Sequence, residues 1–98
     1  MKTLEEIRRL LSEHKAEMRD RFGVRRLAVF GSYTRDEATP LSDVDILIDL
    51  EHPIGWEFVD LHDYLEELLG IPVDLVTEDA LKHKPRLWEH IREDLIHV

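Results

Sequence analysis

Residues 29–48 read VFGSYTRDEATPLSDVDILI, and this stretch decides the fold. Its first residues are the apolar end of a strand that runs into a turn at Gly31-Ser32. A short helix and a loop follow, and a second strand extends from Asp43 to about Leu50. Because the link between the two strands is short, the stretch permits an antiparallel pair.

Apolar residues at helical or alternating spacing predict the elements outside this stretch. A first helix begins at Thr3, a capping residue with Glu6 three places on, and Gly23 ends it. Pro85 divides the last helical region, which Thr77 caps. The predicted elements are a helix over 3–21, strands over 24–30 and 43–50, a helix over 56–69, a strand over 72–77 and helical segments from 77 to about 96.

This order of elements predicts a single domain over residues 1–98 of the α/β (α+β) class. Helices cover a small mixed sheet of three strands or slightly more. The helix over 56–69 should make the connection between the second and third strands a right-handed parallel crossover. A chain of 98 residues is near the lower end of what buries an adequate core without disulfides.

The composition excludes several classes of protein. The chain holds 22 acidic and 13 basic residues, for a formal charge of −9, so it lacks the Lys/Arg surface of a general nucleic-acid binder. It contains no Cys and no apolar run as long as a membrane span, and its N-terminus is charged. We expect neither disulfides, nor export, nor membrane insertion. A cytoplasmic protein is expected, with a basic protein partner or a nucleotide bridged through a metal.

Two carboxylates at the start of the second strand indicate a metal site. Side chains alternate along a strand, so Asp43 and Asp45 share one face while the residues between and after them point into the core. Adjacent carboxylates repel, a divalent cation removes that repulsion, and hard oxygen ligands suit Mg²⁺. Asp74 supplies a third acid, as ligand and candidate base, and three acids permit two ions. Asp49 has the same parity, but we expect it to face water at the far end of the strand.

Gly31 and Ser32 form a candidate phosphate cradle. Gly31 lets the backbone approach a phosphate with no Cβ in the way. Ser32 can cap the short helix that follows and donate its hydroxyl and N–H to phosphate oxygens. Arg35, one turn further on, can reach the phosphates or a partner surface with its forked guanidinium. Together with the three aspartates, these residues predict a metal-dependent site for a nucleoside triphosphate.

The motif residues resemble the signature of the polymerase-β-type nucleotidyltransferase superfamily in its minimal form, the MNT domain. They are Gly31-Ser32, then after ten residues Asp43-x-Asp45, and later Asp74 in a strand of its own. Residues 34–38, TRDEA, are similar to the family's A/T-R-G-E-A segment and differ from it at Asp36, where the family has Gly. The similarity spans nearly the whole chain.

The resemblance implies a polymerase-β-like fold and a defined activity. Members transfer a nucleotide with divalent metal, here Mg²⁺ with two ions, and ATP is the expected substrate. MNT proteins act as antitoxins toward a HEPN-domain partner, and some transfer AMP to a tyrosine of that ribonuclease. A HEPN-domain toxin is therefore the expected partner, with a hetero-oligomer as the expected assembly.

Two other functions also fit the residues. One is a binding module that neutralises its partner by stoichiometric contact, with a vestigial or regulatory nucleotide site. The other is a transferase acting on a small hydroxylated molecule such as an antibiotic, which needs an extra acceptor domain. A single domain of this size has little material with which to bury a nucleotide or select an acceptor, so we expect a partner to complete the site.

Overall fold

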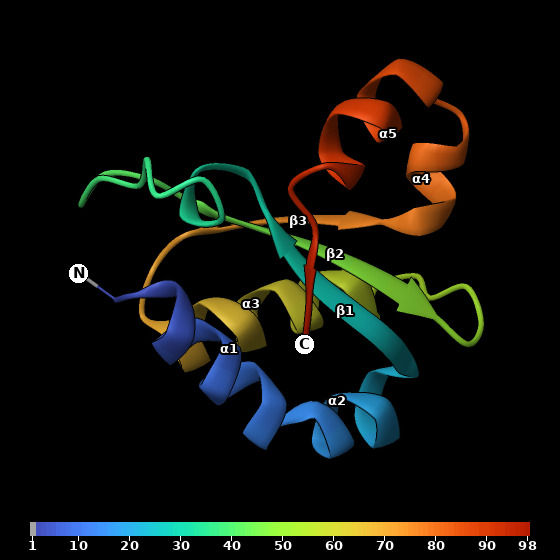
Figure 1. The fold of residues 1–98 in the computed structure, drawn as a ribbon. Coiled ribbons are helices and arrows are strands. Elements are labelled where there is room, and N and C mark those ends of the chain that lie inside the picture. The colour runs from blue at the N-terminus through green and yellow to red at the C-terminus, as the bar shows by residue number, and fades with distance from the viewer. Residues whose placement is uncertain (1) are drawn as a thin grey trace.

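Four strands form one mixed sheet in the order β3-β2-β1-β4 in the computed structural model, which describes residues 2–98. Helices cover both faces of this sheet (Figure 1). The elements are α1 (Leu4–Glu13), α2 (Lys15–Phe22), β1 (Val24–Phe30), the 3-10 helix η1 (Gly31–Tyr33), β2 (Val44–Leu50), α3 (Glu57–Leu69), β3 (Val73–Thr77), α4 (Glu78–Lys82), α5 (Pro85–Arg92) and β4 (Ile96–His97).

The strand connections follow the predicted topology. β1 and β2 pair antiparallel across their short link, with Val29 opposite Ile46. β2 and β3 pair parallel, with Ile46 opposite Leu75, and α3 forms the crossover between them. The short link and the long helical connection thus correctly predicted the orientation of these three strands.

Both faces of β2 are buried, which fixes the strand in the middle of the molecule. Val44, Ile46 and Ile48 are fully buried against the core formed with α1, α2 and α3. On the other face Leu47 packs with Phe30 and with residues of α4 and α5 in a smaller core. Figure 1 shows α1, α2 and α3 below the sheet and α4 and α5 above it.

The first helix breaks at His14, where the sequence predicts one helix from 3 to 21. The backbone N–H of His14 donates to Leu11 O instead of Leu10 O, and the imidazole Nδ1 bonds the freed Leu10 O at 2.9 Å. A straight helix of that length would span about 28 Å, longer than the roughly 23 Å of a seven-residue strand. The break keeps both Leu11 and Met18 fully buried over the sheet.

The C-terminal helix ends at Arg92, earlier than predicted, and the last residues form β4. His97 and Ile96 pair antiparallel with β1, and Val98 N–H donates to Leu27 O at 3.1 Å. Periodicity along the chain cannot reveal this pairing, because its partner lies about 70 residues away. Among residues 2–98 no helix is long and apolar enough to cross a bilayer.

Candidate active site

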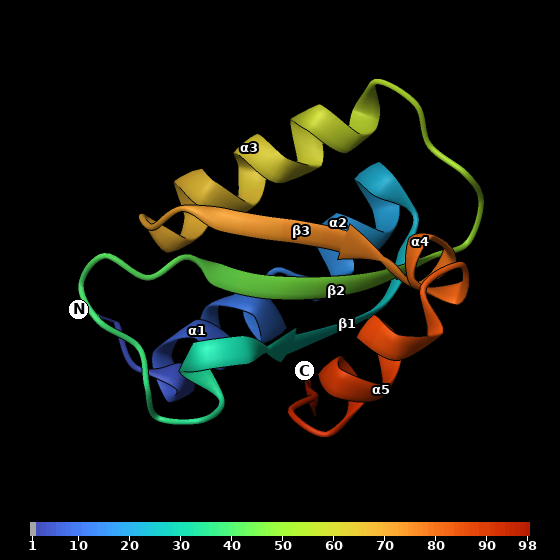
Figure 2. The same ribbon diagram turned by 90° about the horizontal axis from the view of Figure 1, so that it is seen from above.

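Three segments of the chain meet at one end of the sheet. β1 ends where β2 and β3 begin, so Phe30 lies opposite Asp45, and Asp45 lies opposite Asp74. Gly31 follows Phe30 directly. Figure 2 shows η1 and the beginnings of β2 and β3 at this same end. The fold therefore brings the candidate cradle and the strand carboxylates together.

Gly31 lies directly against the carboxylate of Asp45. Its φ of +80° is in the region that residues with a Cβ rarely adopt. A Cβ at this position would overlap Asp45 Oδ2 and lie 3.0 Å from Asp45 Cγ. Only glycine therefore permits this backbone to pass so close to the acid, which links the two halves of the motif physically.

Ser32 does not cap the short helix, contrary to the sequence prediction. η1 begins at Gly31, so its N-cap is Phe30, and no side chain caps it. Ser32 lies inside the helix, where its carbonyl accepts from Glu37 N–H at 2.9 Å. Its side chain is partly exposed, and within residues 2–98 its hydroxyl has no protein partner, so it is free to donate to a ligand.

Asp36 occupies a left-handed position, which explains the glycine that the related motif has there. Its φ is +57°, and Glu37 N–H donates to Ser32 O, the longer of the two bonds of a Schellman motif. Asp tolerates this conformation better than most residues with a side chain. The replacement of Gly by Asp is thus accommodated without changing the turn.

Arg35 is anchored to the far end of the chain. Its Nη1 bonds Asp94 Oδ2 at 2.5 Å and its Nε bonds Glu37 Oε2 at 3.3 Å. The positive charge of Arg35 also acts on Asp45, where it offsets only part of the rise in pKa that burial and the neighbouring acids cause in that carboxyl. Arg35 therefore ties the cradle to the segment after α5 and lies within electrostatic reach of the site. The sequence did not single out Asp94, because it lies within the predicted last helical region as one charged residue among several.

Burial and the neighbouring carboxylates raise the pKa of Asp45 at this site. Burial raises the pKa of Asp45 to about 6, and the charge of Asp74, a hydrogen bond shared with Asp74 and the charge of Asp43 act in the same direction. Asp45 is partly buried, whereas Asp43 and Asp74 are exposed. Within residues 2–98 none of the three forms an ion pair with Lys or Arg. The charge of Arg35 compensates their mutual repulsion only in part.

These donors fit Mg²⁺. All are carboxylate oxygens, the hard ligands that this ion prefers, and the Asp45 and Asp74 oxygens are close enough to share a hydrogen bond. A cation there would replace the proton that two adjacent carboxylates otherwise share. Asp43 precedes β2, which begins one residue later than predicted, and its charge acts on Asp45 from the connecting loop.

A different acidic group, His62, Asp63 and Glu66 on α3, is drawn together more tightly in the described part of the chain, with ligand atoms within 4.8 Å of one another. Two of its members bond the backbone of Val73, through His62 Nε2 to Val73 O at 2.9 Å and Val73 N–H to Glu66 Oε2 at 2.8 Å. These bonds fix the outer edge of β3 one residue before Asp74.

Asp49 does not face water, which corrects the prediction made from its position at the far end of the strand. The carboxyl is only 9% exposed and accepts from Arg25 Nε at 2.9 Å and from Arg26 Nη2 at 2.8 Å. A register irregularity between Val24 and Arg26 makes β1 bulge, and both arginines reach the same acid. The hydrogen bond from Arg25 lowers the pKa of Asp49. Asp49 therefore has its own cations and is separate from the candidate metal ligands.

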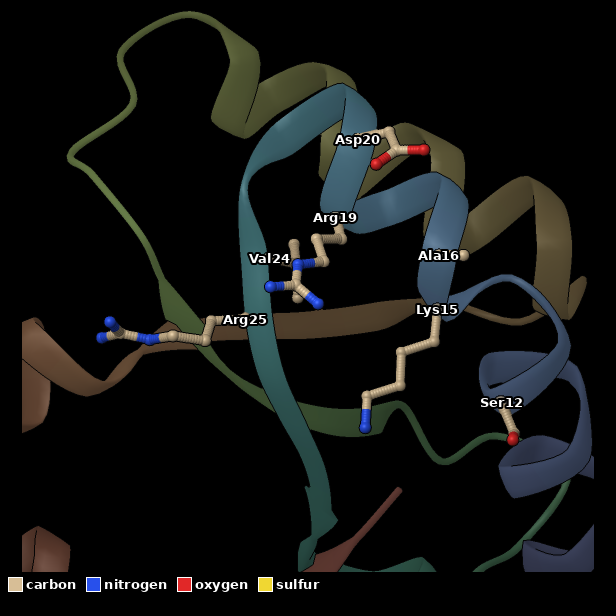
Figure 3. A pocket seen from close by; sticks show the side chains of 7 residues that line it. All are labelled: Ser12, Lys15, Ala16, Arg19, Asp20, Val24 and Arg25. Atoms are coloured by element: carbon tan, nitrogen blue, oxygen red, sulfur yellow. The ribbon is translucent and has the colours of Figure 1, made fainter.

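A hollow lined by charged side chains lies apart from the site. It has a volume of about 670 Å³ and lies between α1 and α2 and the near end of β1 (Figure 3). Its lining residues are Ser12, Lys15, Ala16, Arg19, Asp20, Val24 and Arg25. Its three cationic side chains are occupied, by Val98 O, Glu51 and Asp49 respectively. The hollow is lined by α1 and α2, on the opposite face of the sheet from Asp45.

Comparison with known sequences identifies related proteins. The Nucleotidyltransferase domain family matches residues 11–98. The protein adenylyltransferase MntA of Thermococcus cleftensis is 57% identical over 83 residues, 84% of either chain. A Methanocaldococcus jannaschii protein named "Putative protein adenylyltransferase MJ0126" is 46% identical over 99 residues, 100% of either chain.

Comparison with solved structures supports the fold. A structure described as a "putative minimal nucleotidyltransferase" matches with a TM-score of 0.72 at 35% identity, covering 92% of this chain and 93% of that one. A second, described as a toxin-antitoxin with AMP-PNP, matches with a TM-score of 0.54 at 24% identity, covering 74% and 55%. The second likeness shows the fold alone. The predicted class, a small mixed sheet covered by helices, is confirmed.

Proposed function

Since this chain belongs to the nucleotidyltransferase domain family, we propose that it is an Mg²⁺-dependent enzyme that transfers AMP from ATP to a tyrosine hydroxyl of a HEPN-domain toxin in the cytoplasm, and so silences that toxin. Its relatives support a protein acceptor, because they are named protein adenylyltransferases. A chain of the same fold occurs in a toxin-antitoxin structure with AMP-PNP. The HEPN identity of the partner follows from the resemblance of the motif residues to MNT proteins.

One observation carries the proposal more than any other. Asp45 and Asp74 lie opposite each other on paired strands, with Asp45 directly against Gly31. A crowded carboxylate pair destabilises a fold, and nothing in the cores requires it. The arrangement makes sense as a site for cations that also bind the phosphates of a nucleotide.

The reaction forms one bond and breaks one bond. The acceptor hydroxyl oxygen bonds to the α-phosphorus of ATP, and the bond from that phosphorus to the bridging oxygen of pyrophosphate breaks. Asp74, an exposed carboxylate, would take the proton that the hydroxyl loses. Asp43, Asp45 and Asp74 would hold Mg²⁺, which supplies positive charge against the negative charge that develops on the phosphoryl and leaving oxygens.

The turn after β1 binds and orients the triphosphate in this proposal. Gly31 lets a phosphate approach the backbone, and Ser32 offers a hydroxyl without a protein partner in the described chain. Arg35 adds positive charge while its bond to Asp94 holds the turn in place. Because one arginine both neutralises charge and anchors the turn, we assign it a nucleotide-binding role.

The test is transfer of radiolabelled AMP from ATP to the cognate HEPN protein. The Asp43→Asn/Asp45→Asn variant should lose at least about 100-fold in rate, because ligand replacement in a metal site removes most of the bound cation's effect. Glu89→Gln, an exposed acid on α5, is the matched control and should transfer like the wild type. Undiminished transfer by the double variant would refute the assignment.

A second candidate is neutralisation by stoichiometric binding. It is favoured by the exposure of Asp43 and by the fact that, in the described chain, the three aspartates do not form a set as tight as the group on α3. The double variant separates the two functions. If it still inhibits the HEPN protein fully at equal molar ratio, binding suffices. If inhibition requires ATP and is lost in the variant, transfer is the mechanism.

A further inference from the structure

A tight turn over residues 39–42 presents Leu41 to solvent. Thr39 N–H donates to Ser42 Oγ and Ser42 N–H donates to Thr39 O, both at 2.9 Å. Leu41 N–H donates to Thr39 Oγ1 at 3.2 Å. Pro40 restricts the backbone at the second position of the turn. The backbone is thus held in one conformation while the Leu41 side chain is 92% exposed.

The position of Leu41 distinguishes it from the other exposed apolar side chains among residues 2–98. It lies two residues before Asp43, in the loop that projects from the site end of the sheet, green in Figures 1 and 2. Trp56 is similarly exposed, at 88%, but it precedes α3 and follows the opposite end of β2. Leu41 is therefore an exposed apolar side chain in the loop that leads directly to Asp43.

A single exposed leucine is common on protein surfaces and by itself indicates nothing. For Leu41, the ordered turn around the side chain gives the exposure more significance. Three hydrogen bonds and a proline order the backbone before any partner arrives, so little conformational entropy is lost when the side chain is buried in an interface. A rigid apolar tip beside a reactive site is a suitable element for recognising a second protein.

We propose that Leu41 selects the acceptor, by entering an apolar recess on the acceptor protein next to the hydroxyl that receives AMP. This proposal rests on the proposed function, because it requires the acceptor to be a protein. ATP is a poorer occupant, since its phosphates belong at Gly31 and Ser32 and a lone side chain in solvent forms no wall against a base. Leu41 is thus a specificity residue, separate from the groups that hold the nucleotide.

The experiment measures steady-state transfer to the cognate HEPN protein and calorimetric binding to it. Leu41→Ser should raise the KM for the acceptor roughly tenfold or more, the effect expected from losing one buried leucine, with kcat and the KM for ATP unchanged. Leu41→Met should restore near wild-type values. Trp56→Ser, an equally exposed change remote from the site, is the matched control and should leave both KM values unchanged.

Binding separates this proposal from the proposed function. In the Asp45→Asn background, which removes a metal ligand, Leu41→Ser should weaken binding of the HEPN protein by the same roughly tenfold factor. If the wild type transfers no label yet binds in a Leu41-dependent way, docking stands and catalysis fails. Equal acceptor KM for Leu41→Ser and Trp56→Ser, a higher KM for ATP in Leu41→Ser, or no binding by the wild type overturns the docking proposal.

Discussion

Replacement of Asp45 by Asn is expected to stabilise the metal-free protein at neutral pH while it abolishes transfer. The pKa of Asp45 is about 6 in the folded chain, above the ordinary 3.8. The folded state therefore holds this proton more tightly than the unfolded state. The resulting stabilisation is complete below about pH 4 and is lost as the pH rises from about 4 to about 6. Asn cannot ionise, so the variant escapes that loss.

The pKa difference sets the size of the effect. A rise from 3.8 to about 6 corresponds to at most about 3 kcal/mol of unfolding free energy above pH 6. Asp45 is partly exposed, and solvent screening reduces this to about 1–2 kcal/mol. In a chain of this length such a gain raises Tm by roughly 5–10 °C.

The assay is urea unfolding in the presence of EDTA at pH 4 and pH 7.5. Glu89→Gln removes the same charge from an exposed site on α5 and corrects for the general repulsion within a chain of net charge −9. The advantage of Asp45→Asn over this control should appear at pH 7.5 and be small at pH 4. Equal stability of the two variants at pH 7.5, or an equal advantage at both pH values, would refute the reasoning. Added Mg²⁺ should stabilise the wild type more than Asp45→Asn.

Two further substitutions test the site and the sheet. Gly31→Ala should lower transfer by at least about tenfold and destabilise the fold by about 1–2 kcal/mol, because a Cβ is strained at this φ and displaces the Asp45 carboxylate. Steady-state kinetics and thermal unfolding measure the two effects. Values that match the wild type in both would contradict the contact. Asp49→Asn should lower the unfolding free energy, measured in urea, by about 1–2 kcal/mol, because the bonds from Arg25 and Arg26 lose their charged acceptor. Transfer should persist in this variant. A loss of transfer without a loss of stability would instead place Asp49 in the site.

Local signals in the sequence located most of the elements. Gly23 and Gly70 end α2 and α3 in the left-handed conformation, as glycines after helices do. Thr77 caps α4 through a bond from Ala80 N–H, and Pro85 begins α5. Each of these signals acts within a few residues, so it could be interpreted without knowledge of the tertiary structure.

The features that the sequence did not reveal depend on distant partners. β4 exists because β1 has a free edge, and Asp49 is buried because a bulge directs two arginines toward it. The sequence of the last residues does not show that the edge of β1 is free, and the sequence around Asp49 does not show that β1 bulges. The same distinction applies to the site: strand parity predicted which acids share a face, whereas the alignment of Asp45 with Asp74 required the register of β2 and β3. The catalytic roles of these residues stay a prediction.

The contact between Gly31 and Asp45 has a consequence for how such a protein can change. Strand pairing, and not the connecting loop, holds the two halves of the motif together, because β1 and β2 are in register up to Phe30 and Asp45. Residues 39–42 can therefore vary in length and composition while the reactive groups keep their alignment. Under the role proposed for Leu41, exchange of the loop that carries it would redirect the proposed chemistry toward a new acceptor.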